Sequence, residues 1–339
     1  MRHFIFALAA LCAVLEASPA SAQEPPARVI LVTIDGYRWE DLFRGAEPAL
    51  VTDERYRARY VDVPDRAAAL TPFLLSFAQE GALIGNRDAG SCARVANDFW
   101  FSYPGYAEML SGRPNPNVRS NQAVPNDDVT VLERLARRPE FAGQVRVFAN
   151  WDAVPAIVNA ERSGLPVFLP PAEIVHARDP AVFQAVRESL ADPARVAWVS
   201  LGDTDERAHE GKYEEYLAAA TEADNFLREL WQAIEADPRT SGRTTMIVTV
   251  DHGRGASEHD RWRGHGSGRW RGIVVPGLRH EGSDAIFIAA RGPGVRAGEA
   301  YNPEHCASAG QVAATLLTGL DLLAEEGQPD MAPALDVFE

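Results

Sequence analysis

The stretch TMIVTVDHGRGASEHDRWRGHG, residues 245–266, decides the fold and raises the question of function. It begins as an apolar, β-branched run that is typical of a strand buried on both faces. Asp251 and His252 stand side by side directly after that strand, and two further histidines, His259 and His265, follow. Carboxylates and imidazoles gathered at the end of a strand indicate a metal site. A single loop cannot supply all the ligands, so the other ligands must come from elsewhere in the chain.

Four other segments share the apolar character of this strand and are also predicted to be buried strands. The five strands are residues 28–34, 144–150, 195–201, 245–250 and 284–290. Helical patterns fall between or after them, at residues 67–80, 105–110, 129–137, 179–190, 210–236 and 307–317. Strands that alternate with helices predict an α/β fold. We expect a three-layer α/β/α sandwich with a mostly parallel central sheet, formed as one domain by residues 23–339, with 253–283 as a long loop or a small excursion over one edge.

The first 22 residues predict a secretory signal peptide. They contain one early arginine, an apolar run over residues 4–15, and the small-residue sequence Ala20-Ser21-Ala22 before Gln23. The apolar run is too short to span a bilayer stably, although a retained anchor is the alternative. We therefore expect a periplasmic or secreted mature protein without a stable membrane anchor.

The net charge of −15 argues against a protein that binds a nucleic-acid duplex, because such proteins carry a basic face. A small anionic substrate remains compatible with this charge, since metals or a few arginines can reverse the local field. Lys212 is the only lysine among the 33 basic residues. A side-chain cation that grips an oxyanion here is therefore expected to be a guanidinium. The sequence does not indicate an oligomeric state.

The predicted mature chain contains two cysteines, Cys92 and Cys306. In an oxidising compartment they could form a disulfide that joins two distant parts of the domain. Two separate buried thiols are the alternative, and the sequence leaves both open.

Acidic residues follow three of the predicted strands. Asp35 comes directly after the strand 28–34, Asp203 and Asp205 follow the strand 195–201, and Asp251 follows the strand 245–250. In an open parallel sheet, the ends of these strands meet at one rim. Carboxylates gathered there repel one another and are costly to bury unpaired, and a divalent cation resolves both problems.

A second group of ligands surrounds Asp205. His209 follows it by four residues, so both side chains share one face if this segment is helical. His265 is flanked by two glycines and is preferred as a ligand over His259, which lies in a charged run. The ligands are too many for one tetrahedral ion and predict two zinc ions about 4 Å apart.

Ser102 is the candidate nucleophile. It precedes Tyr-Pro-Gly and a helical run, so it is expected at a helix N-terminus, where free amides and the helix dipole favour an anion. A metal bound to its oxygen would lower the pKa of the hydroxyl. A helix cap without a catalytic role is the alternative for this residue.

Taken together, these motifs resemble the alkaline phosphatase superfamily, and in particular its nucleotide pyrophosphatase/phosphodiesterase-like branch. The resemblance runs from VTIDGYRWEDLF, at residues 32–43, to about residue 295, and it rests on DG, SYPGY, DERAH, DHG and GHG in the order that the family uses. It implies one zinc held by Asp35, Ser102, Asp251 and His252, and a second held by Asp205, His209 and His265. It also implies that Ser102 forms a phospho-serine and that Asn121 contacts a phosphate oxygen, with Asn126 the less favoured candidate.

The resemblance implies a secreted two-zinc hydrolase of small phosphate esters, with monoesterase and diesterase activity both open. A sulfatase-like hydrolase is one alternative, but Tyr106 stands where the formylglycine pattern has arginine. A non-catalytic zinc-binding relative is another. The loops 36–66 and 253–283 are expected to flank the mouth of the site. Their Arg38, Trp39, Trp262, Arg263 and Trp270 could contact a leaving group or simply pack within the loops.

Overall fold

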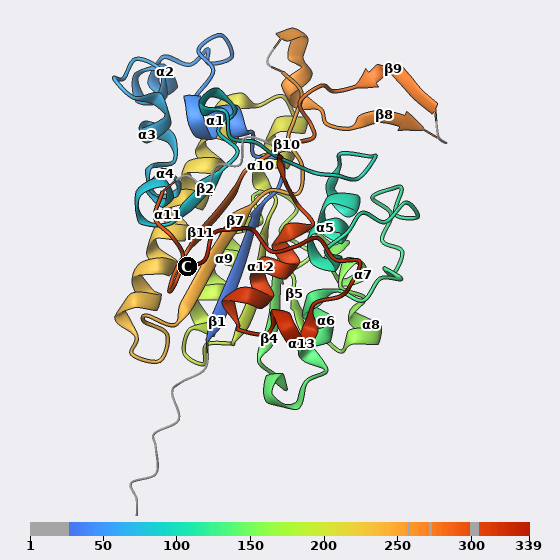
Figure 1. The fold of residues 1–339 in the computed structure, drawn as a ribbon. Helices are drawn as coiled ribbons and strands as arrows, with labels where there is room; N and C mark the ends of the chain where they lie inside the picture. The colour runs from blue at the N-terminus through green and yellow to red at the C-terminus, as the bar shows by residue number, and fades with distance from the viewer. Residues whose placement is uncertain (1–26, 257, 271–272, 299–304) are drawn as a thin grey trace, which may run out of the picture.

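A computed structural model describes residues 27–256, 258–270, 273–298 and 305–339 (Figure 1). The predicted signal peptide lies outside these residues. Within them, no helix combines the length and the apolarity needed to cross a membrane.

A seven-stranded sheet forms the centre of the molecule, in the order β2-β11-β7-β1-β6-β4-β5. Its strands are β1 (Arg28–Ile34), β2 (Ala82–Ile84), β4 (Val145–Ala149), β5 (Val167–Phe168), β6 (Val196–Leu201), β7 (Thr244–Thr249) and β11 (Ile288–Arg291). The five strands from β7 to β5 are parallel, whereas β11 is antiparallel to both of its neighbours. The predicted mostly parallel sheet is confirmed.

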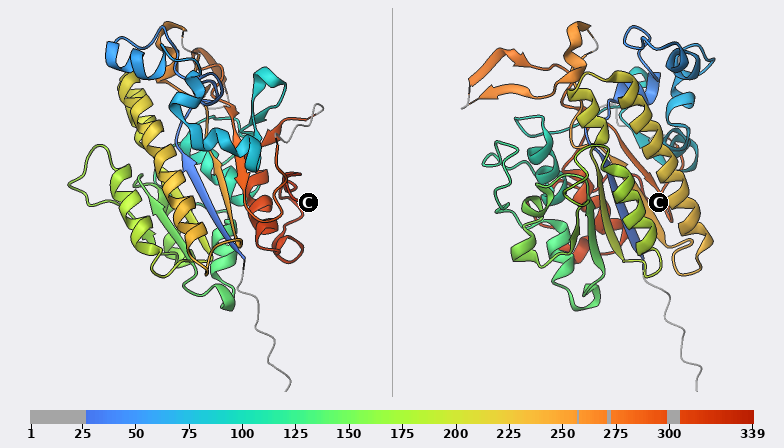
Figure 2. Two further views of the ribbon diagram at one scale, coloured as in Figure 1. Left: turned by 90° about the vertical axis from the view of Figure 1, so that its left-hand side faces the viewer. Right: turned by 180° about the vertical axis from the view of Figure 1, so that it is seen from behind.

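Helices cover both faces of this sheet, which gives the three layers seen edge-on in Figure 2. α9 and α11 lie on one face, and α5 and α12 lie on the other. The helices are α1 (Trp39–Arg44), α2 (Glu54–Tyr60), α3 (Arg66–Leu70), α4 (Pro72–Glu80), α5 (Ser102–Ser111), α6 (Val131–Ala136), α7 (Val154–Ile157), α8 (Ala160–Ser163), α9 (Asp179–Ser189), α10 (Asp203–His209), α11 (Tyr213–Ala236), α12 (Gln311–Gly319) and α13 (Leu323–Glu326). Central strands are apolar on both sides because both of their faces are covered: every residue of β6 and β7 is buried.

Several predicted elements differ in their bounds. The helix predicted at 67–80 is interrupted at Thr71, because a residue that precedes proline is disfavoured in the helical conformation, and α4 restarts at Pro72. The strand predicted at 284–290 is divided into β10 (Ala285–Ile286), which pairs with β3 (Ala93–Arg94), and β11. The helix predicted at 307–317 begins later, after the short strand β12 (Ala307–Ser308).

The segment 253–283, predicted as a long loop, contains regular structure. It forms a 3-10 helix, η3 (Glu258–Arg263), and a hairpin of β8 (Ser267–Trp270) and β9 (Ile273–Arg279). The hairpin projects away from the sandwich at the top of Figure 1. Its base is closed by a hydrogen bond from His280 N–H to the Gly266 carbonyl at 2.9 Å.

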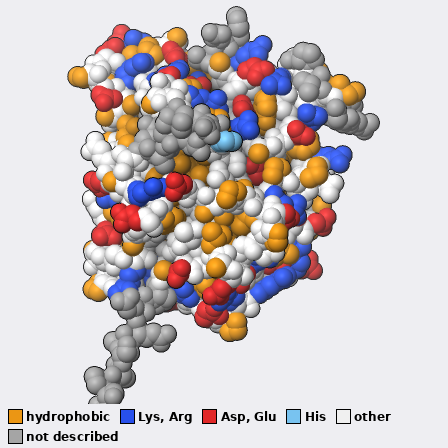
Figure 3. Space-filling view, viewed as in Figure 1, with side chains coloured by type: hydrophobic (Ala, Val, Ile, Leu, Met, Phe, Trp, Pro, Cys, Tyr) orange, Lys and Arg blue, Asp and Glu red, His pale blue; other side chains and the backbone are white. Residues whose placement is uncertain are grey.

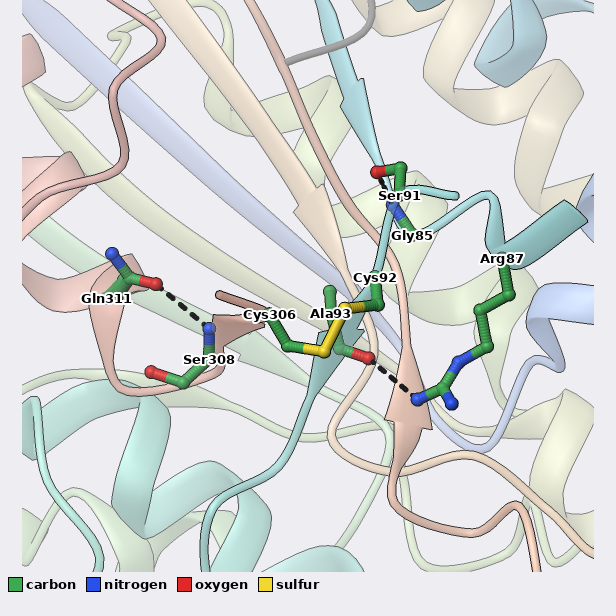
Figure 4. Close-up of a disulfide and its surroundings, with 8 residues drawn as sticks. All are labelled: Gly85, Arg87, Ser91, Cys92, Ala93, Cys306, Ser308 and Gln311. Carbon is green, nitrogen blue, oxygen red and sulfur yellow. Dashed lines mark hydrogen bonds between the residues drawn. A yellow bond between two sulfur atoms is a disulfide. The ribbon is translucent and has the colours of Figure 1, made fainter. Parts of the chain in front are cut away.

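Cys92 and Cys306 form a disulfide, which decides the question that the sequence left open (Figure 4). The bond joins residues 214 positions apart. It lies beside a small three-stranded sheet in which β3 is flanked by β10 and β12. On the face of the molecule in Figure 3, acidic and basic side chains are interspersed.

Candidate metal centre and active site

Three neighbouring parallel strands bring the acidic residues to one edge of the sheet. β1 lies between β6 and β7, and its Thr33 is level with Ser200 and Thr249. Asp35 and Asp251 therefore follow their strands at the same edge, where α10 also begins.

Asp35, Asp251 and His252, together with Ser102, form what we call the two-carboxylate set. His252 Nε2 lies 3.3 Å from Asp35 Oδ1 and 3.3 Å from Asp251 Oδ2. The same nitrogen lies 3.3 Å from Ser102 Oγ. All four side chains are buried. An ion held by the two carboxylates and the imidazole would therefore lie within reach of the serine hydroxyl.

The hydrogen bonds of this set leave room for a cation. Asp35 Oδ2 accepts from the Tyr106 hydroxyl at 3.0 Å, and Asp251 Oδ1 accepts from the Gly36 N–H at 3.1 Å. The other oxygen of each carboxylate is buried and accepts no hydrogen bond from the described residues. Such unpaired buried oxygens are costly, and hard or borderline cations are their natural partners. The donor set fits zinc.

His252 is held in an orientation that suits a metal ligand. Its Nδ1 lies 2.8 Å from the Gly253 carbonyl, which can only accept, so Nδ1 carries the proton and Nε2 faces the carboxylates. Burial lowers the pKa of His252, but Asp251 and Asp35 raise it more strongly, to about 9. Burial and the charge of Asp35 also raise the pKa of Asp251 well above its usual value. Without a metal, protons therefore balance the crowded charges here.

Asp205, His209 and His265 form a second group, which we call the two-histidine set. Asp205 and His209 share one face of α10, with His209 Nε2 3.2 Å from Asp205 Oδ2. His265 Nε2 lies 3.0 Å from His209 Nε2 and 3.7 Å from Asp205 Oδ1. The His265 and His252 rings stack with centroids 3.9 Å apart, so the two sets adjoin. Asp205, His252 and His265 can also converge on a single ion.

Burial and neighbouring charges shift the pKa values of Asp205 and His265. Burial raises the pKa of Asp205, but Arg254 and the neighbouring histidines lower it well below its usual value. Burial and the nearby His252 lower the pKa of His265 well below its usual value. An ionised carboxylate and a neutral imidazole are the forms that bind metals.

Arg254 belongs to this centre, although nothing in the sequence singles it out. Its side chain is 1% exposed, and Nη1 donates to Asp205 Oδ1. Gly36 makes room for the guanidinium, because a Cβ at that position would lie 2.7 Å from Arg254 Nη1. A single arginine in the glycine-rich sequence DHGRG carries no signal that it is buried.

Helix α5 positions Ser102 through its close contact with β7. A Cβ at Gly105 would lie 2.1 Å from the Asp251 carbonyl oxygen, so only glycine permits this approach. The free amides expected at this helix N-terminus are mostly missing. Pro104 has no N–H, the Gly105 N–H bonds the Phe101 carbonyl, and the Tyr103 N–H bonds Asn121 Oδ1 at 2.9 Å. In this turn only the N–H of Ser102 itself remains for a ligand.

The two candidate asparagines differ in their surroundings. Asn121 is exposed and uses Oδ1 to accept the Tyr103 N–H, so its Nδ2 is directed away from that bond and can donate. Asn126 is buried, and both ends of its amide are used, by the Asp128 N–H and the Ile157 carbonyl.

Two other residues that the sequence analysis named, Asp203 and Tyr106, form hydrogen bonds that support the structure around the site. Asp203 accepts the backbone N–H groups of Arg178 and Asp179, at the start of α9, and the side-chain amide of Asn150. Tyr106 is fully buried and burial raises its pKa well above the usual value, so its neutral hydroxyl orients Asp35.

The aromatic and basic residues expected near the mouth are mostly buried in the loops. Arg38 forms an ion pair with Asp41, and the ring of Trp262 packs against Tyr213. Trp39 is buried as well, with the guanidinium of Arg44 over its ring. The side chains of His259 and Trp270 lie outside those that the structure describes.

Comparison with solved structures places this architecture among known folds. A putative sulfatase from Bacteroides thetaiotaomicron matches with a TM-score of 0.58 and 11% identity, over 91% of this chain and 73% of that one. A phosphonate monoester hydrolase from Silicibacter pomeroyi matches with a TM-score of 0.57 and 13% identity, over 91% and 76%. Murine ectonucleotide pyrophosphatase/phosphodiesterase 5 matches with a TM-score of 0.55 and 13% identity, over 87% and 95%.

The chain has the alkaline phosphatase fold. The solved structures that share it include hydrolases of phosphate and phosphonate esters and a putative sulfatase, and the chain is similar to them over most of its length. Neither a protein-family model nor a curated protein sequence matches the chain.

Proposed function

We propose that the protein is a secreted two-zinc hydrolase of phosphate esters that acts through a phospho-serine. One observation carries the proposal: Ser102 Oγ lies 3.3 Å from His252 Nε2, the atom on which the unpaired oxygens of Asp35 and Asp251 converge. A nucleophile next to a cation site is what phosphoryl transfer requires.

The residues that would hold zinc are those of the two sets. Asp35, Asp251, His252 and Ser102 would hold one ion, and Asp205, His209 and His265 would hold the other. Bound zinc would supply Lewis-acid polarisation of phosphate oxygens and would favour the ionised form of a nearby hydroxyl or water.

The Ser102 oxygen attacks the phosphorus of the ester. The bond between phosphorus and the oxygen of the leaving alcohol breaks as the phospho-serine forms. Asn121 Nδ2 and the Ser102 N–H donate to the non-bridging oxygens, where negative charge accumulates in the transition state. The N-terminal end of α5 adds its positive dipole at the same place. Hydrolysis of the phospho-serine then restores the hydroxyl.

Diesters and monoesters are both candidate substrates. Murine ectonucleotide pyrophosphatase/phosphodiesterase 5 was solved in complex with AMP, and the phosphonate monoester hydrolase also shares the fold. We favour the diesterase-like reading because the order and style of the motifs follow that branch. The predicted signal peptide and the disulfide support secretion.

A sulfatase is the second candidate, because a putative sulfatase shares the fold. Conversion of Ser102 to formylglycine is disfavoured by Tyr106, which stands where that pattern has arginine and whose hydroxyl is bound to Asp35.

The test compares zinc-loaded wild type with Ser102→Ala on nitrophenyl phosphate, bis-nitrophenyl phosphate and nitrophenyl sulfate. We expect one phosphate ester to be hydrolysed and the variant to lose that rate by about three orders of magnitude or more. Ser76→Ala, which removes a serine hydroxyl from α4, is the matched control and should keep the rate. Turnover of the sulfate alone would support the sulfatase, and no turnover of any ester would support a non-catalytic zinc protein.

A further inference from the structure

We propose that Arg254 makes the two metal sites unequal, so that zinc in the two-carboxylate set is held tightly and zinc in the two-histidine set exchanges readily. This inference rests on the proposed function, since it assumes that both sets bind zinc. The inference goes beyond that function because it assigns a role to Arg254, to which the proposed mechanism assigns none.

The two sets differ in charge. The two-carboxylate set places Asp35 and Asp251 around one imidazole, and each carboxylate keeps an oxygen without a hydrogen-bond partner among the described residues. The two-histidine set has a single carboxylate, Asp205, and one of its oxygens already accepts from Arg254. The affinity of a site for a divalent cation rises with the negative charge of its ligands. A guanidinium in contact with the only carboxylate opposes the binding of a second cation there.

Arg254 cannot turn away when a metal binds. Its Nε donates to the Trp262 carbonyl at 2.7 Å, and its Nη2 donates to the Arg263 carbonyl. The side chain is almost fully buried and lies against Gly36. The guanidinium therefore places a positive charge beside Asp205.

Solvent access also favours faster exchange of zinc in the two-histidine set. His252 and Asp251 are fully buried, whereas the side chain of His209 is 49% exposed and that of Asp205 is 18% exposed. Water and chelators can therefore reach an ion in the two-histidine set more easily than one in the two-carboxylate set.

Arg254 also has a positioning role that experiment can separate from its charge. The two carbonyls that it binds lie three and two residues before His265, so the arginine ties Asp205 to the segment that carries that histidine. Arg254→Lys keeps the charge but loses the forked contact with both carbonyls. Arg254→Met loses the contact and the charge together, so the difference between the two variants isolates the charge.

The first experiment measures zinc content. Zinc-loaded full-length mature protein is dialysed against a chelator of intermediate affinity, and the metal that remains is counted by elemental analysis. We expect one zinc per chain in wild type and in His265→Ala, and none in Asp35→Asn. Retention of zinc by Asp35→Asn together with its loss from His265→Ala would reverse the assignment and overturn the inference.

The second experiment measures the affinity for the second zinc by competition with a chromophoric chelator. We expect wild type to bind its second zinc more weakly than its first, and Arg254→Met to bind the second zinc about 10- to 100-fold more tightly than Arg254→Lys, because the opposing positive charge is gone. If Arg254 had a purely structural role, both variants would bind the second zinc equally weakly. That result would overturn the inference. If neither variant folds, the dialysis of wild type, Asp35→Asn and His265→Ala decides.

The outcomes separate this inference from the proposed function. Two zincs of equal affinity in a protein that hydrolyses phosphate esters would overturn the inference alone. Failure of the wild type to bind any zinc would overturn the proposed function and the inference with it.

Discussion

His252 is the residue at which proton and metal compete. Its Nε2 faces Asp35 and Asp251, and the pKa of about 9 means that the metal-free protein carries a proton there at neutral pH. Zinc must displace that proton, so zinc binding at this set is linked to pH.

This linkage predicts that the melting temperature of the metal-free protein and the rise caused by zinc change in opposite directions with pH. Protonated His252 stabilises the folded state fully below its unfolded pKa of about 6.5, and this stabilisation is lost as the pH rises towards 9. We expect the melting temperature in the presence of a chelator to fall between pH 6.5 and 8.5, and the rise caused by zinc to grow over the same range. Thermal unfolding with and without zinc measures both. A zinc effect of constant size in wild type would contradict the prediction.

Asn121 allows a test of phosphate recognition, because it is exposed and its replacement does not disturb the core. Removal of a donor that contacts transition-state charge costs about 10²- to 10³-fold in kcat. We therefore expect Asn121→Ala to lower kcat by at least about 100-fold with unchanged zinc content, and to lower the melting temperature slightly because the Tyr103 N–H loses its acceptor. Gln122→Ala, the exposed neighbour, is the control. A similar loss in both variants would point to a disturbed loop.

For single residues, the sequence predicted which candidate ligands would lie close together. It did not predict the side chains that hold those ligands in place. The ligand candidates were recognisable because aspartates follow strands and histidines have metal-ligand spacing. Arg254 and Tyr106 were not recognisable, because their roles depend on burial and on partners far along the chain. The catalytic and metal-binding roles themselves stay predictions.

Among the elements, α5 is the one whose placement the proposed chemistry depends on most. Its Gly105 touches the backbone of Asp251, so the nucleophile and the metal ligands share one rigid contact. A Cβ there would force the helix away from β7.

Gly105→Ala is therefore expected to lower kcat by about 100-fold, because a displacement of about 1 Å is enough for a loss of that size. Zinc binding by the two-carboxylate set should be weakened as well, since Ser102 moves with the helix. Kinetics and zinc content measure the two effects. Gly277→Ala, where an added Cβ would have no neighbour within 4 Å, is the control. Normal kinetics in Gly105→Ala would show that α5 tolerates the shift.

The elements that the sequence missed are short or irregular. β2 and β5 have three and two residues, too few for a hydrophobic period to appear. The apolar run 284–290 looked like one strand because apolarity does not reveal that β10 and β11 belong to different sheets. Buried parallel strands, by contrast, are long and continuously apolar, which is why β1, β4, β6 and β7 were predicted closely.

For the molecule as a whole, the disulfide is a covalent constraint between two distant parts of the chain. It closes a segment of 214 residues, and a cross-link over such a length stabilises the folded state by about 5 kcal/mol through the unfolded chain. We expect the double variant Cys92→Ser with Cys306→Ser to lose about this much in denaturant unfolding and to retain its zinc. Reduction of the wild type should give a similar loss. An unchanged unfolding midpoint would show that the fold does not depend on the bond.

The overall architecture was predictable because it follows from an alternation of strand and helix that is written along the whole chain. The hairpin of β8 and β9 was not predicted, because the segment 253–283 is rich in Gly and Arg and reads as a loop.

That hairpin leaves the body of the protein and returns to it at nearly the same point. Gly266 and His280 are hydrogen-bonded to each other, and Ser267 pairs with Arg279, so the two ends of the excursion are fixed beside His265. Everything beyond this closure can change in length or composition while the histidine stays where it is. The hairpin is thus a segment that evolution or protein engineering can replace. A new recognition surface can be placed next to the candidate site without changes to the site itself.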